Sequence, residues 1–176
     1  MTAKRYTHSP LKYYKLDSSV KDPIFATEGS ACFDIHAYIP NGTKVKIYDE
    51  FGNIDFITCT NGSFTLEHDW RAMIPTGLIF DISEGWVVKL YARSGLALKQ
   101  GLVLANAVGI VDSDYVDPVF AIMQNTSNCA ITFKDGTRIC QGYMDMVPKY
   151  NLIEVSERPG QKTERDGGFG STGIGE

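Results

Sequence analysis

The sequence predicts an all-β fold of the sandwich, jelly-roll or barrel kind, with one short helix. Short runs rich in β-branched and aromatic residues recur along the 176 residues, whereas a 3.6-residue apolar period over ten or more residues is almost absent. Compositions typical of turns, rich in glycine and asparagine, separate these runs. Many short strands without helices between them favour a sandwich or barrel over a parallel sheet.

Seven strands are expected from the clearest apolar runs, and turns from the residues between them. The strands are expected at residues 11–16, 45–48, 54–59, 86–91, 119–124, 130–133 and 142–147. Turns are expected at residues 49–53, 61–62, 83–85 and 134–136, because glycine and asparagine tolerate positive φ angles.

One segment, residues 92–101, has the composition of a short helix. Ser94 is a good N-cap, residues 96–100 are helix formers, and Gly101 is a natural C-cap. With Arg93 at its start, such a helix would offer backbone N–H groups, a hydroxyl and a guanidinium to an anion. A plain capped helix with a solvated arginine fits these ten residues equally well.

Composition excludes several classes of protein. The length suits one domain, and the net charge of -4 argues against broad adhesion to nucleic acid, so a polyanionic ligand would need a local cationic pocket. Neither a signal peptide nor a membrane-spanning run is visible, which predicts a soluble, cytoplasmic protein. Cys32, Cys129 and Cys140 lie in or beside apolar sequence, so they are expected to be buried hydrophobes rather than zinc ligands.

The C-terminal tail is polar from Glu157 onward and then becomes rich in glycine over residues 167–173, with Phe169 in the middle. The simplest interpretation is a flexible end. The alternative is a lid, in which glycines allow the backbone close to phosphates and Phe169 offers a flat surface to a base.

Five separated segments, taken together, resemble in order the five motifs of the trimeric dUTPase family. The resemblance spans residues 26–173, and any one motif alone would be weak. The matching segments are residues 31–35, 93–97, 109–115, 138–141 and 167–173.

The resemblance implies a jelly-roll-like β domain over residues 1–156 that forms a homotrimer, with active sites at the subunit interfaces. It also implies that a flexible arm, residues 157–176, crosses to a neighbour and closes over bound nucleotide. Residues 41–66 exceed the usual family length and are interpreted as a β-hairpin insertion. This insertion either lengthens the sheet or provides a docking surface for another protein.

The implied activity is hydrolysis of dUTP to dUMP and pyrophosphate, which limits uracil in DNA and supplies dUMP. Asp112 matches the family's catalytic aspartate and would orient the attacking water. Tyr115 would lie against the deoxyribose and exclude a ribose 2′-hydroxyl, and Asn106 would read one polar edge of uracil. Mg²⁺ would bridge the phosphates while keeping most of its water ligands.

The remaining site residues are also implied by the motifs. Asp34 would take an outer-shell metal or structural role, and Arg138 would pair with an acidic neighbour. The expected triphosphate and arm contacts are Arg93, Ser94, Gly95, Gln141, Arg165, Phe169, Gly170 and Ser171.

The chain departs from the family pattern in three places. Ala92 replaces the usual proline of the second motif, residues 116–118 replace a segment with glycine two residues after Tyr115, and Arg165 lies one residue too close to Phe169. Two alternatives therefore stay open: a dCTP deaminase of the same fold, and a nucleotide-binding regulatory protein that has lost fast chemistry.

Overall fold

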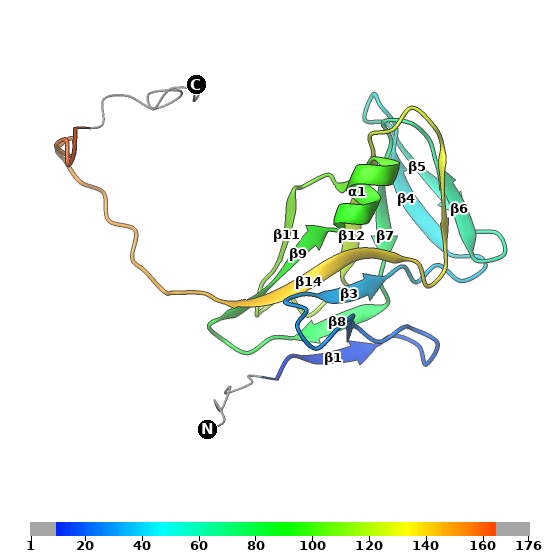
Figure 1. Ribbon diagram of the computed structural model, residues 1–176, viewed down its shortest axis with the longest axis horizontal. Coiled ribbons are helices and arrows are strands. Elements are labelled where there is room, and N and C mark those ends of the chain that lie inside the picture. The colour runs from blue at the N-terminus through cyan, green and yellow to red at the C-terminus, as the bar shows by residue number, and fades with distance from the viewer. Residues whose placement is uncertain (1–9, 165–176) are drawn as a thin grey trace.

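Two five-stranded antiparallel sheets enclose most of the core of this computed structural model, which describes residues 10–164 (Figure 1). The elements are β1 Lys12–Lys15, β2 Ile24–Phe25, β3 Phe33–His36, β4 Lys44–Tyr48, β5 Ile54–Thr58, β6 Ser63–Leu66, β7 Arg71–Pro75, β8 Leu78–Asp81, β9 Trp86–Ala92, α1 Ser94–Gln100, β10 Leu102–Leu104, β11 Val108–Val111, β12 Phe120–Asn125, β13 Ile131–Lys134 and β14 Arg138–Met146.

The strand order explains how distant segments meet. The first sheet, which we call the site sheet, has the order β11-β9-β14-β3-β2, and the second has the order β10-β12-β7-β4-β5. Two small sheets, β1-β8 and β13-β6, complete the described part. Neighbours in each sheet are mostly distant in sequence, so the register brings together the first motif on β3, the second motif directly after β9 and the fourth motif on β14.

The core forms where the inner faces of these sheets meet. Val45, Ile74 and Met123 of the second sheet are fully buried, as are Ile35 and Ile139 near the site sheet. Burying one such side chain contributes about 1.5–3 kcal/mol. The core strands alternate buried and more exposed residues, which is the two-residue period of a β-strand with one buried face.

The seven expected strands are all present, six of them within one residue of their predicted ends, while β14 begins four residues earlier than predicted. The four expected turns are confirmed, since Gly52, Gly62, Gly85 and Gly136 all have positive φ angles. Seven further strands were not expected, among them β3 and β11, which carry site residues. The expected burial of the cysteines was wrong for Cys129, which is exposed.

The short helix α1 is confirmed, but its predicted N-cap was wrong by one residue. Arg93 is the N-cap, with φ -85° and ψ 125°, and its carbonyl accepts from the N–H groups of Leu96 and Ala97. Arg93 keeps an extended backbone directly after β9, and its side chain is bound to Asp34 on β3, two strands away in the site sheet. Gly101 is the C-cap, with a φ of 66°.

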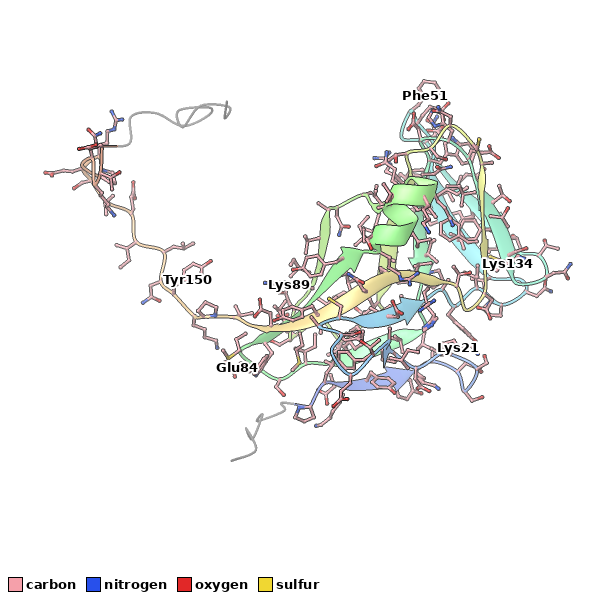
Figure 2. The ribbon with its side chains drawn as sticks, viewed as in Figure 1. Lys21, Phe51, Glu84, Lys89, Lys134 and Tyr150 are labelled. Atoms are coloured by element: carbon pink, nitrogen blue, oxygen red, sulfur yellow. The ribbon has the colours of Figure 1, made fainter. Side chains whose placement is uncertain are left out.

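The predicted insertion, residues 41–66, is built into the sheets. β4 lies between β5 and β7 and buries Val45 and Ile47, while β6 pairs with β13. β5 forms an exposed edge of the second sheet, and Phe51 lies at the tip of the β4–β5 turn, away from the core (Figure 2). Removing the whole segment would therefore open the core.

The last strand, β14, ends at Met146, and the described chain beyond it runs away from the sheets without forming a strand (Figure 1). Tyr150 lies on this segment, well away from the body (Figure 2). Its side chain is exposed, as are those of Leu152 and Ile153. Within the described residues, no helix is long and apolar enough to cross a membrane.

Candidate active site

A carboxylate and two guanidinium groups form a cluster on the site sheet. The Nε atom of Arg93 donates to Oδ1 of Asp34 at 3.0 Å, and a terminal nitrogen of Arg138 donates to Oδ2 of the same carboxylate at 3.0 Å. Arg93 also donates to the carbonyl of Arg138 at 3.3 Å. Two positive charges share one negative charge, so the cluster retains a net positive charge that suits an anion.

The antiparallel register creates this cluster. Asp34 on β3 is opposite Gln141 on β14, and Gln141 is opposite Tyr91 on β9, so the three residues form one row across the sheet. Arg93 follows β9 and Arg138 begins β14, at the same end of the sheet. The pairing predicted between Arg138 and an acidic neighbour is confirmed.

The helix start supplies further polar groups beside this cluster. Ser94 and Gly95 are exposed, and a Cβ added to Gly95 would meet nothing within 4 Å. The guanidinium of Arg93 is ion-paired, which excludes the interpretation that it is merely solvated. Its planar fork has five N–H donors, so donors remain for a phosphate beyond the bonds to Asp34 and Arg138.

Two side chains beside the cluster carry no charge at neutral pH. Burial and the negative charge of Asp34 raise the pKa of the Cys140 thiol to about 12. Burial also lowers the pKa of His36, and its Nδ1 atom is buried without a hydrogen-bond partner among the described residues. The charge of the cluster therefore comes from Asp34 and the two arginines.

A second group of predicted residues surrounds a small pocket. The segment joining β10 to β11 turns at Asn106 and Ala107, where Ala107 adopts a φ of 58°. Gly109 packs against Leu90, since a Cβ there would lie 3.0 Å from the Cβ of Leu90. The pocket measures about 240 Å³ and is lined by Met73, Leu90, Asn106, Gly109, Ile110, Val111, Tyr115, Val119, Phe120 and Ile122.

The predicted catalytic aspartate follows β11 directly. Asp112 is exposed, and its carboxylate has no hydrogen bond or ion pair with another described residue. The carbonyl of Asp112, rather than its side chain, closes the following turn by accepting from the N–H of Tyr115 at 3.2 Å. The carboxylate is therefore available to a water molecule.

The structure does not bring these two groups together within one chain. Val111 is opposite Val88, and Arg93 lies five residues further along β9, in the direction away from Asp112. At about 3.3 Å per residue, those five residues span about 16 Å. The side chain of Arg93 turns toward Asp34 on β3, on the far side of β14 from β11.

Asn106 and Tyr115, both predicted from the sequence, line the pocket, whereas its apolar lining was not predicted. Met73, Phe120 and Ile122 line the pocket, but in the sequence they cannot be told from ordinary strand residues. The pairing of Arg93 with Asp34 was also missed, because 59 residues separate them. Four predicted contacts lie outside the described residues, namely Arg165, Phe169, Gly170 and Ser171.

The fold and the two groups define a jelly-roll-like β protein with a cationic anion site and a separate small pocket. Residues 55–173 match the dUTPase family profile. A deoxyuridine 5'-triphosphate nucleotidohydrolase of Caulobacter vibrioides is 34% identical over 164 residues, covering 93% of this chain and 92% of the relative. A protein of the same name from Rhizobium leguminosarum bv. trifolii is 41% identical over 152 residues, covering 86% and 85%.

Solved structures show the same fold. A mutant dUTPase of Staphylococcus bacteriophage 80alpha, bound to dUpNHpp, superposes with a TM-score of 0.71 at 21% identity, covering 95% of this chain and all of the other. A mutant dUTPase of phage phi11, whose structure concerns a structural Mg(II) ion, superposes with a TM-score of 0.67 at 17% identity, covering 86% and 100%. The chain belongs to the dUTPase family.

Proposed function

We propose that this protein hydrolyses dUTP to dUMP and pyrophosphate, and thereby limits uracil in DNA and supplies dUMP. Family membership and the names of the relatives support the reaction. The observation that carries the proposal is the exposed, unpaired carboxylate of Asp112 beside the small pocket of the β10–β11 segment. It suits a water molecule attacking the α-phosphate of a nucleotide whose base lies in that pocket.

The pocket has the chemistry needed to select a deoxyuridine. Its lining combines apolar side chains with the amide of Asn106, which can donate and accept at one polar edge of uracil. The close packing of Gly109 on Leu90 supports a base site without spare room. Tyr115 lines the same pocket, where its ring would lie against the sugar.

The cationic cluster has the chemistry needed for the phosphates. Arg93 is held by Asp34 in a fixed orientation. Ser94 and Gly95 follow Arg93 directly in the sequence, and Gln141 is opposite Asp34 in the strand register. Preorganised donors stabilise charge that develops on phosphoryl oxygens without reorganising during the reaction. The same role is proposed for Arg165, with Phe169, Gly170 and Ser171 closing over the nucleotide.

The separation between the two groups supports a site shared between subunits. Asp112 and Arg93 lie at opposite ends of the β9–β11 pair, about 16 Å or more apart along the strands. A triphosphate is much shorter than that, so one chain cannot offer both residues to one nucleotide. We propose that a homotrimer places the Arg93 cluster of one copy beside the pocket of the next.

Mg²⁺ is proposed as the cofactor, bound mainly by the phosphates and water. No cluster of three or more acidic, histidine or cysteine side chains among residues 10–164 could hold a metal by itself. Both oxygens of Asp34 accept from arginines, which suits an outer-shell contact through water rather than direct ligation. The bound ion would neutralise charge on the phosphate oxygens.

Pyrophosphate release from dUTP, dCTP, dTTP and UTP, with and without Mg²⁺, tests the proposal. We expect selective release from dUTP, and a loss of several powers of ten in kcat for Asp112→Asn, on the scale of removing a group that positions the reacting water. Asp114→Asn, two residues away, is the matched control. Ammonia release from dCTP would favour the deaminase alternative, and nucleotide binding without turnover would favour the regulatory one.

We also propose that residues 41–66 dock another protein through the β4–β5 turn and β5. Phe51, Ile54 and Phe56 are exposed there, whereas Val45 and Ile47 of β4 belong to the core. Replacing Phe51 and Phe56 by serine would test for a partner without opening the core. Loss of dUTP turnover in such a folded variant would show that this surface serves catalysis instead.

A further inference from the structure

The segment that follows Tyr115 is tied back onto the tyrosine ring. The hydroxyl of Tyr115 donates to the carbonyl of Pro118 at 2.9 Å. The N–H of Tyr115 donates to the carbonyl of Asp112 at 3.2 Å. The backbone N–H and the side-chain hydroxyl of Tyr115 are therefore both hydrogen-bonded, although its side chain is 40% exposed.

The acceptor of this hydroxyl is itself anchored in the core. Val119, directly after Pro118, donates its N–H to the carbonyl of Leu78 at 2.8 Å. The carbonyl of Val119 accepts from both the N–H and the hydroxyl of Thr76, at 3.2 and 2.7 Å. Val119 and Thr76 are 2% and 1% exposed. The carbonyl of Pro118 and the N–H of Val119 belong to one planar peptide, so the anchored N–H also holds the carbonyl, and the fixed φ of proline restricts the backbone before it.

The tethered ring and its anchor both border the small pocket. Tyr115 and Val119 each line it, together with Asn106 of the segment that joins β10 to β11. The Tyr115 ring can exclude the 2′-hydroxyl of a ribose only if the ring does not move aside. A tyrosine ring whose hydroxyl is unbonded can rotate about its side-chain bonds, whereas one bonded to a fixed carbonyl keeps its position.

We infer that Pro118 is a positioning residue for sugar selection: its anchored carbonyl fixes the Tyr115 ring so that a ribonucleotide is excluded from the pocket. This inference rests on the proposed function, because it assumes that the pocket holds a deoxyuridine nucleotide. It gives a role to residues 116–118, where the chain departs from the family pattern. The hydrogen bond from Tyr115 to Pro118 makes this segment rigid, where the family pattern has a flexible, glycine-containing segment.

The ratio of kcat/KM for dUTP to kcat/KM for UTP measures this selection. Tyr115→Phe removes the donor and keeps the ring, and we expect the ratio to fall about fivefold, the effect of losing one neutral hydrogen bond. Pro118→Gly keeps the carbonyl but frees the backbone, and should also lower the ratio. Because both variants act through one bond, their effects should not multiply. The ratio of the double variant should lie within about twofold of the lower of the two single-variant ratios.

The matched control is Tyr13→Phe, which removes a tyrosine hydroxyl bonded to Asp22 at 3.0 Å, outside the pocket. Its ratio should equal that of the wild type. An unchanged ratio for Tyr115→Phe would overturn the inference, as would effects of the two variants that multiply in the double variant. If Pro118→Gly fails to fold, Tyr115→Phe alone decides. A wild type that does not release pyrophosphate from dUTP would instead refute the proposed function.

Discussion

Replacing Asp34 with asparagine should destabilise the protein measurably, because one buried carboxylate holds two arginines. Its side chain is 8% exposed, and those of Arg93 and Arg138 are 26% and 48% exposed. Hydrogen bonds to charged groups are worth about 1.5–3 kcal/mol each. The Arg138 bond counts for less because solvent screens it. Since asparagine keeps one acceptor oxygen, the expected loss is about 3 kcal/mol.

For a protein of this size, that loss corresponds to a fall of about 6–12 °C in Tm. Thermal and urea unfolding at one fixed protein concentration would measure it, since subunit assembly makes Tm depend on concentration. The matched control is Asp81→Asn, which breaks an ion pair with Lys12 whose side chains are 72% and 73% exposed. Its Tm should match that of the wild type. An Asp34→Asn protein as stable as that control would refute the structural role assigned to the cluster.

Three further predictions follow from packing and charge. Gly142→Ala should lower stability by about 1–3 kcal/mol, because the added Cβ would lie 2.4 Å from the buried Phe33 ring; Gly29→Ala, with nothing within 4 Å, should be neutral in the same urea titration. Iodoacetamide should label Cys129 in the native protein and spare Cys140, whose thiol has a pKa of about 12 and is buried, as mass spectrometry would show. Native labelling of Cys140 would contradict the packing. The hydrogen bond from Lys89 lowers the pKa of Asp145 and raises that of Lys89, so the pair should stabilise the fold between about pH 4 and pH 10 and lose this effect outside that range. A Tm difference between wild type and Asp145→Asn that stays constant as the pH falls below about 4 would contradict this assignment.

The strands and turns of the β class were predictable because their signals are local. Glycines such as Gly52 and Gly136 mark turns by the φ angle that they must adopt, and the alternation in β4 marks its buried face. By contrast, β3 and β11 are four residues each, too short for a clear period of their own. Their identity as strands comes from pairing with β14 and β9, which is a long-range property.

The same distinction applies to the site. The motifs located Asp112, Asn106 and Tyr115, and the structure places the last two at one pocket. The shared carboxylate of Asp34 depends on register between strands about a hundred residues apart in sequence, which no local pattern encodes. The N-cap error at Ser94 is also a matter of context, because Arg93 keeps an extended backbone while its carbonyl accepts the first helical hydrogen bonds, so the helix begins one residue earlier than predicted.

The bond from Tyr115 to Pro118 shows how a departure from the family pattern acquires a meaning only in three dimensions. In the sequence, residues 116–118 cast doubt on substrate preference. In the structure, Pro118 provides a fixed acceptor beside the pocket. The departure thus becomes a specific hypothesis about selection of the sugar.

The central claim, that Asp112 and Arg93 of different copies serve one nucleotide, is tested most directly by mixing two inactive variants. Asp112→Asn and Arg93→Ala, co-expressed in equal amounts, should form mixed trimers in which about one quarter of the interfaces keep both residues intact. We predict that the mixture regains about a quarter of the wild-type rate of pyrophosphate release from dUTP. A mixture no more active than its separate components, despite confirmed mixed assembly, would contradict the shared site.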